Sequence, residues 1–278
     1  MRLLIIGGSG FVGRGLSAAL RDRHGVTIAS RHRPEWADEY GVQWVSCDIT
    51  DRTALAHALG NVSVDVVVDL VGLIDEKEQR HNDVNVGGTA NIVELLKGTT
   101  VKLVYFSAIN SEHGTTQYFS TKRAAEANVG THENHVIIRP SMLYGEHDHI
   151  VTQLSDMARG FVPGLPRSGI LCPVYIGDMA TVFERLLGET GSFNVCSEER
   201  LSLGDMFNMI RRKLGKRPVP QLPRWLFYPV MPVLSSKGLM SMEQLAMLGH
   251  DFFRQDTVLP KYVPRPKRFE DFVDEYVR

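Results

Sequence analysis

An α/β fold built on a doubly wound parallel sheet is predicted by three observations. The chain opens with a continuous apolar run, Leu3 to Ile6, as expected for a parallel strand buried on both faces. Glycines interrupt this run at Gly7, Gly10 and Gly13, and apolar residues then resume at helical spacing. Further apolar runs alternate with helical stretches through the first half of the chain. The order of strand, glycine turn and helix is that of a Rossmann-type unit.

The alternation of strands and helices continues to Pro140 and then becomes irregular. Apolar runs predict further strands at residues 26–29, 42–46, 64–72, 102–106 and 136–140, with a helix over 82–96. Prolines accumulate beyond this point. We therefore expect a nucleotide-binding Rossmann domain over residues 1–140, to which a strand and helix near 173–188 return. A smaller, mostly helical lobe over 141–278 is expected to hold the substrate or a partner.

Composition and charge are those of an ordinary soluble protein. The 278 residues include 31 Lys and Arg against 32 Asp and Glu, and the net charge of -1 gives no support to nucleic-acid binding. No apolar stretch approaches the roughly 20 residues of a membrane span. The first strand begins at Arg2 or Leu3, which leaves no room for a signal peptide in the chain as given. We expect a cytoplasmic protein, or one of an organelle matrix if the chain is a processed form.

No metal site is expected. The cysteines Cys47, Cys172 and Cys196 are far apart and odd in number, which is typical of reduced, buried thiols. The run Glu146-His147-Asp148-His149 contains ligand-type residues but has no third clustered ligand, which favours a polar loop at the rim of a pocket.

The three glycines of the first turn have separate roles in a dinucleotide site. The first permits the sharp turn, the second lets the backbone approach a pyrophosphate, and the third lets the helix pack against the strand. The free N–H groups and the positive dipole at the helix start attract phosphates. The alternative is a strand-to-helix turn without a ligand. Cofactor contacts are expected from Gly7, Ser9, Gly10, Phe11, Val12 and Gly13.

The residues after the second strand indicate which cofactor is bound. A carboxylate at this place would bind the ribose hydroxyls of NAD, but the chain offers Ser30, Arg31 and Arg33, which can hold the 2′-phosphate of NADP. Arg31 is the first candidate because it lies nearer the strand end. NADP(H) is therefore the preferred cofactor and NAD(H) the alternative, while a solvated basic loop would account for the same residues without a ligand.

Two further strand ends carry candidate cofactor contacts. Asp48 could accept a hydrogen bond from the adenine amino group while Ile49 packs on the ring, or Asp48 could merely shape the turn. Leu70, Val71 and Gly72 end the fourth strand in an apolar-glycine step suited to lie beside the cofactor.

A Tyr-x-x-x-Lys pair, Tyr118 and Lys122, is the leading catalytic candidate. Residues four apart lie on the same helical face. There the ammonium can lower the pKa of the tyrosine from about 10 and bind the nicotinamide ribose, so that the tyrosine exchanges a proton with a substrate oxygen. Such a pair by itself is commonly a surface feature, but here it follows the fifth strand of a nucleotide fold.

The apolar and aromatic segment 222–234 is too short and too interrupted by prolines to span a bilayer. Burial between the two lobes would account for it. The alternative is contact with a protein partner or a membrane surface.

Several motifs occur in one order along the chain. They are the Gly7/Gly10/Gly13 loop, Asp48-Ile49, Asn85-Val86-Gly87-Gly88-Thr89-Ala90-Asn91, Tyr118/Lys122 and Arg139-Pro140-Ser141-Met142-Leu143-Tyr144-Gly145. In combination they resemble the extended, epimerase/dehydratase-like short-chain dehydrogenase/reductase superfamily, over most of the chain. Other motifs are Asp69-Leu70-Val71-Gly72, Phe106-Ser107-Ala108, Pro173-Val174-Tyr175-Ile176-Gly177-Asp178-Met179-Ala180 and Leu239-Met240-Ser241-Met242-Glu243-Gln244-Leu245. On these the chain looks most like the atypical group of the nucleotide-binding accessory subunit of respiratory complex I and its prokaryotic relatives.

The resemblance implies a Rossmann-type sheet with a small C-terminal substrate lobe over the strand ends. It implies that Asp48 and Ile49 hold adenine, and it adds Asn85 and Pro140 to the expected cofactor contacts.

One departure from the superfamily pattern concerns catalysis. Typical members carry a Ser or Thr, one or two places beyond the first Ser of the fifth-strand motif, that binds the substrate oxygen, but here those places are Ala108 and Ile109. Ser107 could substitute for it, and Asn110 is a further polar candidate. Loss of one such donor commonly lowers turnover roughly 10²–10³-fold, so weak or absent catalysis has to be considered.

Three functions are consistent with these residues. The first is an NADP(H)-preferring oxidoreductase of a small carbonyl or alcohol, with Tyr118 as general acid/base, Lys122 as its partner and Ser107 as substrate orienter. The second is a non-catalytic NADPH-binding accessory or redox-sensor protein. The third is a nucleotide-sugar epimerase or dehydratase, which is less favoured because no pyrophosphate-binding arginine cluster stands out in the second lobe.

Overall fold

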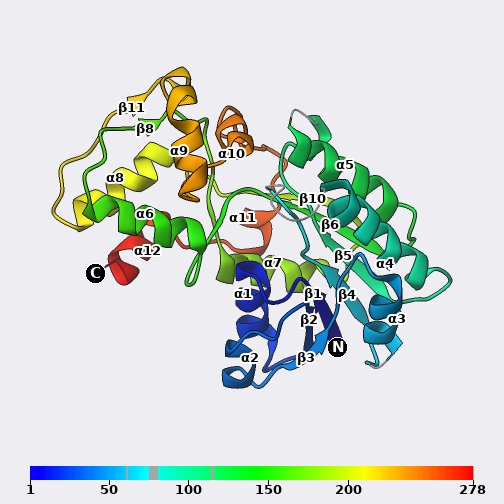
Figure 1. Cartoon of the computed structure of the whole chain (residues 1–278). Coiled ribbons are helices and arrows are strands. Elements are labelled where there is room, and N and C mark those ends of the chain that lie inside the picture. Colours follow the sequence, from blue (N-terminus) through cyan, green and yellow to red (C-terminus); the bar gives the residue numbers. More distant parts are fainter. Residues whose placement is uncertain (61, 75–80, 114–115, 278) are drawn as a thin grey trace.

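A seven-stranded sheet forms the centre of the computed structural model, which describes residues 1–60, 62–74, 81–113 and 116–277 (Figure 1). Its strands are β1 (Arg2–Ile6), β2 (Gly25–Ser30), β3 (Gln43–Ser46), β4 (Val66–Asp69), β5 (Lys102–Phe106), β6 (His135–Pro140) and β10 (Gly191–Val195). They lie in the order β10-β6-β5-β4-β1-β2-β3, and all neighbours are parallel. The predicted doubly wound α/β fold is confirmed.

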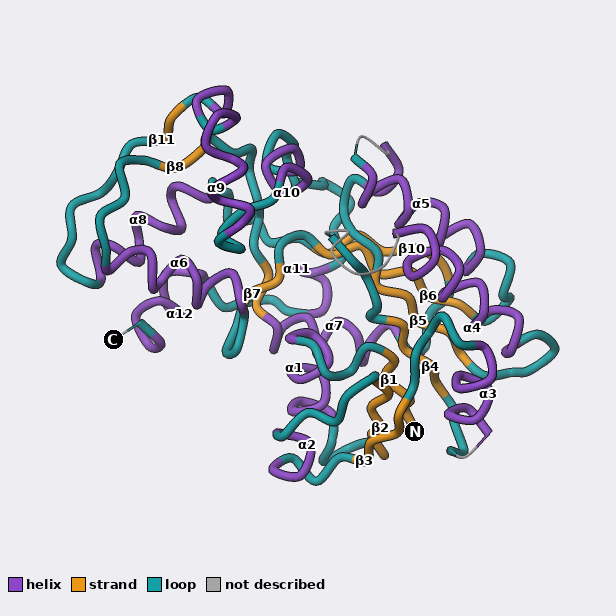
Figure 2. Tube along the Cα trace, in the orientation of Figure 1, coloured by secondary structure: helices purple, strands orange, loops and turns teal. Residues whose placement is uncertain are grey.

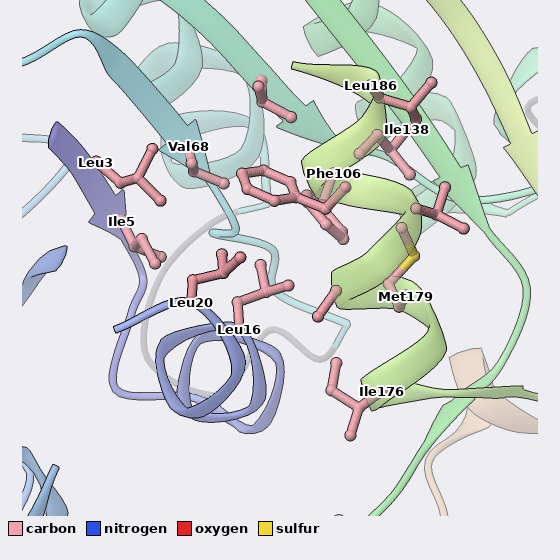
Figure 3. Packing of buried hydrophobic residues seen from close by; sticks show 14 of the residues in the cluster. Leu3, Ile5, Leu16, Leu20, Val68, Phe106, Ile138, Ile176, Met179 and Leu186 are labelled. Atoms are coloured by element: carbon pink, nitrogen blue, oxygen red, sulfur yellow. The ribbon is translucent and has the colours of Figure 1, made fainter. Parts of the chain in front are cut away.

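Helices cover both faces of the sheet because its strands are apolar on both sides. On β1, Leu3 and Ile5 belong to one core cluster, and Leu4 and Ile6 to the other. Figure 3 shows the first cluster between the sheet, α1 and α7. Its helices are α1 (Phe11–Leu20), α2 (Trp36–Glu39), α7 (Ile176–Leu186) and α11 (Leu259–Tyr262). The opposite face carries α3 (Arg52–Gly60), the π-helical turn η1 (Asn82–Gly88), α4 (Thr89–Leu96) and α5 (Gln117–Val129).

The rest of the chain forms a smaller lobe with its own core, in which Phe207, Phe269 and Phe272 are buried with Tyr144. Figure 2 shows this lobe beside the carboxyl ends of the strands. Its longer helices are α6 (His149–Arg159), α8 (Leu203–Lys213) and α12 (Phe269–Tyr276), and short strands pair as β7 (Leu143–Tyr144) with β9 (Val174–Tyr175) and β8 (Leu165–Pro166) with β11 (Gln221–Leu222). The remaining elements are the single turns η2 (Ser111–His113), η3 (Arg224–Leu226) and η4 (Tyr228–Val230), followed by α9 (Met231–Ser236) and α10 (Met242–Met247).

The sheet contains one strand that the apolar pattern did not predict. β10 pairs with β6 at the edge of the sheet, but its sequence, Gly-Ser-Phe-Asn-Val, has no continuous apolar run. The expected strand at 64–72 is shorter, because the chain leaves the sheet after Asp69. The three cysteines are free and buried. Within the described ranges, no helix has both the length and the apolar character needed to cross a bilayer.

Candidate functional site

The glycine turn follows β1 at the point where the strand order reverses, with β4 on one side and β2 on the other. Gly7 has a φ of +77°, and a Cβ there would lie 2.9 Å from Val71 Cγ2. A Cβ at Gly13 would lie 2.3 Å from the Gly8 carbonyl oxygen, so only glycine lets α1 pack this closely on the turn. At Gly10 the nearest atom to a Cβ is Gly7 O at 3.6 Å, which leaves the outer side of the turn open.

The start of α1 is not capped by a side chain. Gly10 occupies the N-cap position without a side-chain hydrogen bond, and the first turn contains no acidic residue. The backbone N–H groups of this turn have no intrahelical partner. They and the helix dipole could bind the phosphates of a nucleotide at the open side of the turn.

The three basic-loop candidates after β2 differ in their surroundings. Ser30 is buried, and its hydroxyl donates to His32 O (2.8 Å) and accepts from Trp44 Nε1 (3.0 Å). Arg33 is paired with Asp38. Arg31 is exposed, and its guanidinium makes no ion pair or hydrogen bond to any described residue. Of these candidates, Arg31 is the one whose charge is available for a ligand.

Asp48 and Ile49 lie just beyond β3. Asp48 Oδ1 accepts hydrogen bonds from the backbone N (2.9 Å) and the hydroxyl (2.7 Å) of Thr50, so this carboxylate does shape the turn. Ile49 is buried, and its Cγ2 methyl group would lie 2.7 Å from a Cβ at Gly88. Its carbonyl accepts a hydrogen bond from Asn91.

The exit of β4 is held by Asp69, which is fully buried. Its carboxylate accepts from Val71 N (3.0 Å) and from the hydroxyl of Thr89 (2.8 Å). Burial raises the pKa of Asp69, while the positive charge of Lys122 opposes this rise. These contacts fix the course of the segment that passes the glycine turn.

Asn85 of η1 is bound entirely within the protein. Its oxygen accepts from Leu73 N (2.8 Å), and its amide group donates to Leu73 O (3.1 Å) and to the hydroxyl of Thr121 (3.1 Å). Both amide hydrogens are therefore used. Asn85 ties the β4 exit to α5.

Helix α5 brings Tyr118 and Lys122 to the carboxyl ends of the central strands. The ammonium of Lys122 is buried and donates to Val71 O (3.2 Å) and Phe106 O (2.9 Å), the backbone beyond β4 and at the end of β5. It lies 6.0 Å from the centre of the Tyr118 ring. A Cβ at Gly72 would come within 2.8 Å of the nitrogen, so this glycine leaves room for the lysine.

The acid–base properties of the pair differ from the expectation. Burial raises the pKa of Tyr118 to about 12, whereas a lowering by Lys122 was predicted. Burial also lowers the pKa of Lys122 to about 8, although the carboxylates of Asp69 and Glu126 oppose this. In this structure the desolvation of the phenol outweighs any stabilisation of the phenolate. A raised pKa keeps the hydroxyl of Tyr118 protonated and able to donate a hydrogen bond, but it makes Tyr118 a weaker acid than an ordinary tyrosine.

The β5 exit contains Ser107, which faces a buried ion pair. Arg139 donates to both oxygens of Glu126, at 3.0 and 2.6 Å, and Ser111 donates to the same carboxylate at 2.7 Å. Burial alone would raise the pKa of Glu126, but hydrogen bonds from Arg139 and Ser111 hold it below its usual value. The hydroxyl of Ser107 is buried and makes no hydrogen bond to a described residue.

The residues after Ser107 are arranged as the sequence indicated. Ala108 and Ile109 are buried and have no donor to offer, and Ile109 N donates to Pro140 O (3.0 Å). Pro140 therefore helps to hold the β5 exit. Asn110 has a φ of +74°, and its amide donates to Asp251 O (2.9 Å) in the smaller lobe.

A cavity of about 380 Å³ lies where the β5 exit meets the smaller lobe. Its lining includes Asn110, His113, Arg200 and Arg254. Arg254 is paired with Glu112, while the Arg200 guanidinium lies 4.1 Å from the centre of the Phe253 ring. The sequence shows no arginine cluster in the second lobe, but folding places Arg200 and Arg254 on one cavity. Because the two arginines are far apart in the sequence, no local motif predicts that they lie together.

Glu243 of α10 was not singled out as a functional residue. Its carboxylate accepts a hydrogen bond from the backbone N of Tyr118 (2.7 Å) at the start of α5. This position suits an anion because the free N–H groups and positive dipole of a helix lie there. The smaller lobe therefore contacts the main chain of the leading catalytic candidate directly.

Comparison with known proteins assigns the family. Residues 3–195 match the NAD dependent epimerase/dehydratase family, and the chain belongs to it. This confirms the predicted extended short-chain dehydrogenase/reductase superfamily. The closer likeness to the complex I accessory subunit stays a prediction.

Individual relatives are more distant. An uncharacterized protein of Mycobacterium tuberculosis (strain ATCC 25618 / H37Rv) is 26% identical over 227 residues, 79% of this chain, but the chain spans only 24% of that relative's length. A 2-alkyl-3-oxoalkanoate reductase of Stenotrophomonas maltophilia (strain K279a) is 27% identical over 186 residues, 57% of this chain and 56% of that one. The structure of the Bordetella bronchiseptica enzyme WbmG in complex with NAD aligns with a TM-score of 0.78 at 18% identity, over 99% of this chain and 94% of WbmG.

Proposed function

We propose that the protein is an NADPH-linked reductase of a carbonyl compound, with Tyr118 as the proton donor. The observation that carries this proposal is the placement of Tyr118 and Lys122 on one face of α5, where the Lys122 ammonium lies 6.0 Å from the centre of the Tyr118 ring and donates to Val71 O and Phe106 O. The Stenotrophomonas relative, named a 2-alkyl-3-oxoalkanoate reductase, supports carbonyl reduction as the reaction class.

The residues at the sheet edge fit a dinucleotide. The open side of the turn at Gly10 and the uncapped start of α1 would receive the pyrophosphate. Asp48 and Ile49 would hold adenine, and Leu70, Val71 and Gly72 would line the nicotinamide half. Arg31 would pair with the 2′-phosphate. Asn85 and Pro140 would act by holding the loops in place.

The chemistry is divided between the cofactor and the chain. When bound, the cofactor supplies the hydride that reduces the carbonyl carbon. Tyr118 gives its phenolic proton to the carbonyl oxygen, which completes the alcohol and leaves a phenolate to be reprotonated from solvent. Lys122 stabilises that phenolate by its charge. Because Ala108 and Ile109 cannot donate to the oxygen, we expect slow turnover.

The test compares Tyr118→Phe with Tyr228→Phe, an exposed control tyrosine in the smaller lobe. With NADPH and a panel of carbonyl compounds that includes 3-oxo acids, Tyr118→Phe should lower kcat by about 10²–10⁴-fold and leave NADPH affinity within twofold. The control should match the wild type. If no carbonyl is reduced and NADPH still raises the melting temperature, the accessory or sensor function replaces this proposal.

A nucleotide-sugar epimerase or dehydratase is the second candidate. It is favoured by Arg200 and Arg254 on one cavity, which could bind a diphosphate. In that case UDP or dTDP should raise the melting temperature in the presence of cofactor, and Arg200→Ser should remove this shift. A shift with NADPH but none with either nucleotide would favour the simple reductase.

A further inference from the structure

A group of apolar side chains is exposed at the outer end of the smaller lobe. Ten large apolar side chains are exposed in the described part of the chain, and six of them are Trp225, Leu226, Tyr228, Val230, Val233 and Met242. Trp225 exposes 66% of its surface and Val233 56%. We call these six residues the apolar tip. They lie on η3, η4, α9 and the start of α10, and Figure 1 shows α9 at the end of the molecule opposite β1, β2 and β3.

The apolar tip is mounted on a segment that is anchored to the lobe. Met231 and Leu245, between and beside the exposed residues, are buried. The turn between α9 and α10 is held by Gln153, whose amide donates to Leu239 O (3.0 Å), and by Ser235, which donates to Met240 O (3.0 Å). The segment therefore has an inward face that packs and an outward face that is apolar as well. Large exposed apolar patches commonly mark interaction sites.

The segment that carries the apolar tip contains few charged side chains. Between residues 221 and 247 the chain has two basic side chains, Arg224 and Lys237, and one acidic side chain. Arg224 is half-buried, and Lys237 is exposed. The acidic residue, Glu243, accepts the hydrogen bond from Tyr118 N and is thus directed towards α5. Of the three charged side chains of this segment, Lys237 is the exposed one, and it is a cation beside the exposed apolar groups.

We propose that the apolar tip binds the surface of a membrane that contains anionic lipids. Trp and Tyr favour the boundary between water and hydrocarbon, where both their apolar rings and their polar groups are accommodated. Lys and Arg beside them are attracted by anionic headgroups. No described helix could cross the bilayer, so the contact is peripheral. This use of the segment is independent of the proposed catalytic function.

The experiment measures binding of the full chain to phosphatidylcholine vesicles with and without phosphatidylglycerol. Sedimentation should bring the wild type down with the anionic vesicles and much less with neutral ones. The double variant Trp225→Ser/Val233→Ser should weaken binding at least tenfold. The double variant Arg224→Gln/Lys237→Gln should weaken it about 25-fold on anionic vesicles, at about fivefold for each cation.

Tyr276→Ser is the matched control, because Tyr276 is an exposed aromatic residue on α12, outside the segment. It should bind vesicles as the wild type does. Unchanged melting temperatures show that each variant is folded. Failure of the wild type to bind anionic vesicles, or equal binding by the Trp225→Ser/Val233→Ser variant, overturns the proposal. A wild-type dimer that this variant converts to a monomer, without vesicle binding, would assign the apolar tip to a second copy of the chain instead.

Discussion

Replacing Arg31 with Ser should separate the affinities for NADPH and NADH. Arg31 is exposed and makes no hydrogen bond or ion pair to a described residue, so its loss should change the free energy of unfolding by less than about 0.5 kcal/mol. A charge-assisted hydrogen bond contributes about 1.5–3 kcal/mol, and exposure favours the lower part of this range because solvent and salt screen the pair. We expect NADPH to bind about 10- to 30-fold more weakly and NADH to bind unchanged within twofold.

The matched control is Arg33→Ser, because the Arg33 guanidinium is already paired with Asp38. Titration calorimetry with both nucleotides, at low and at high salt, measures the four affinities. The effect of Arg31→Ser should shrink as salt rises, since the contact is electrostatic. An equal loss for NADPH and NADH, or a larger effect of Arg33→Ser, would refute the assignment of Arg31 to the 2′-phosphate.

Three more predictions concern packing, acid–base chemistry and the contact between the lobes. Gly13→Ala should lower the free energy of unfolding by about 1–3 kcal/mol, because the new Cβ would lie 2.3 Å from Gly8 O. Gly60→Ala is the control, because a Cβ at Gly60 would meet no atom within 4 Å. Equal melting temperatures of the two variants would contradict this reasoning. Reductase kcat/KM should fall as the pH rises through about 8, because Lys122 loses its proton there. Lys122→Arg should shift this fall to higher pH. A fall at the same pH in this variant would exclude Lys122 as the group responsible. Glu243→Ala should cost about 0.5–2 kcal/mol of stability and reduce kcat with NADPH affinity unchanged, whereas Glu243→Gln, which keeps an acceptor for Tyr118 N, should recover most of both.

Local sequence patterns were sufficient for the sheet and for the cofactor turn. Leu3 to Ile6 are apolar on both faces of β1, and the glycine spacing reflects contacts within a few residues of the turn. The Tyr118/Lys122 pair was also readable, because the helical repeat alone puts residues four apart on one face. β10 was missed because an edge strand with polar residues lacks the apolar run that identifies central strands.

What the sequence by itself determined was therefore the fold class, the turn that could bind a dinucleotide and the helix that carries the catalytic candidate. Only the tertiary structure decided the ion pairing, the burial and the spatial neighbours of the candidate residues. It paired Arg33 with Asp38 and left Arg31 available, raised the pKa of Tyr118 by burial, and brought Arg200 and Arg254 to one cavity. It also placed Glu243 on the start of α5 and left the apolar tip uncovered. The physical reason is that backbone periodicity acts over neighbouring residues, whereas burial and ion pairing depend on groups that meet only when the chain is folded.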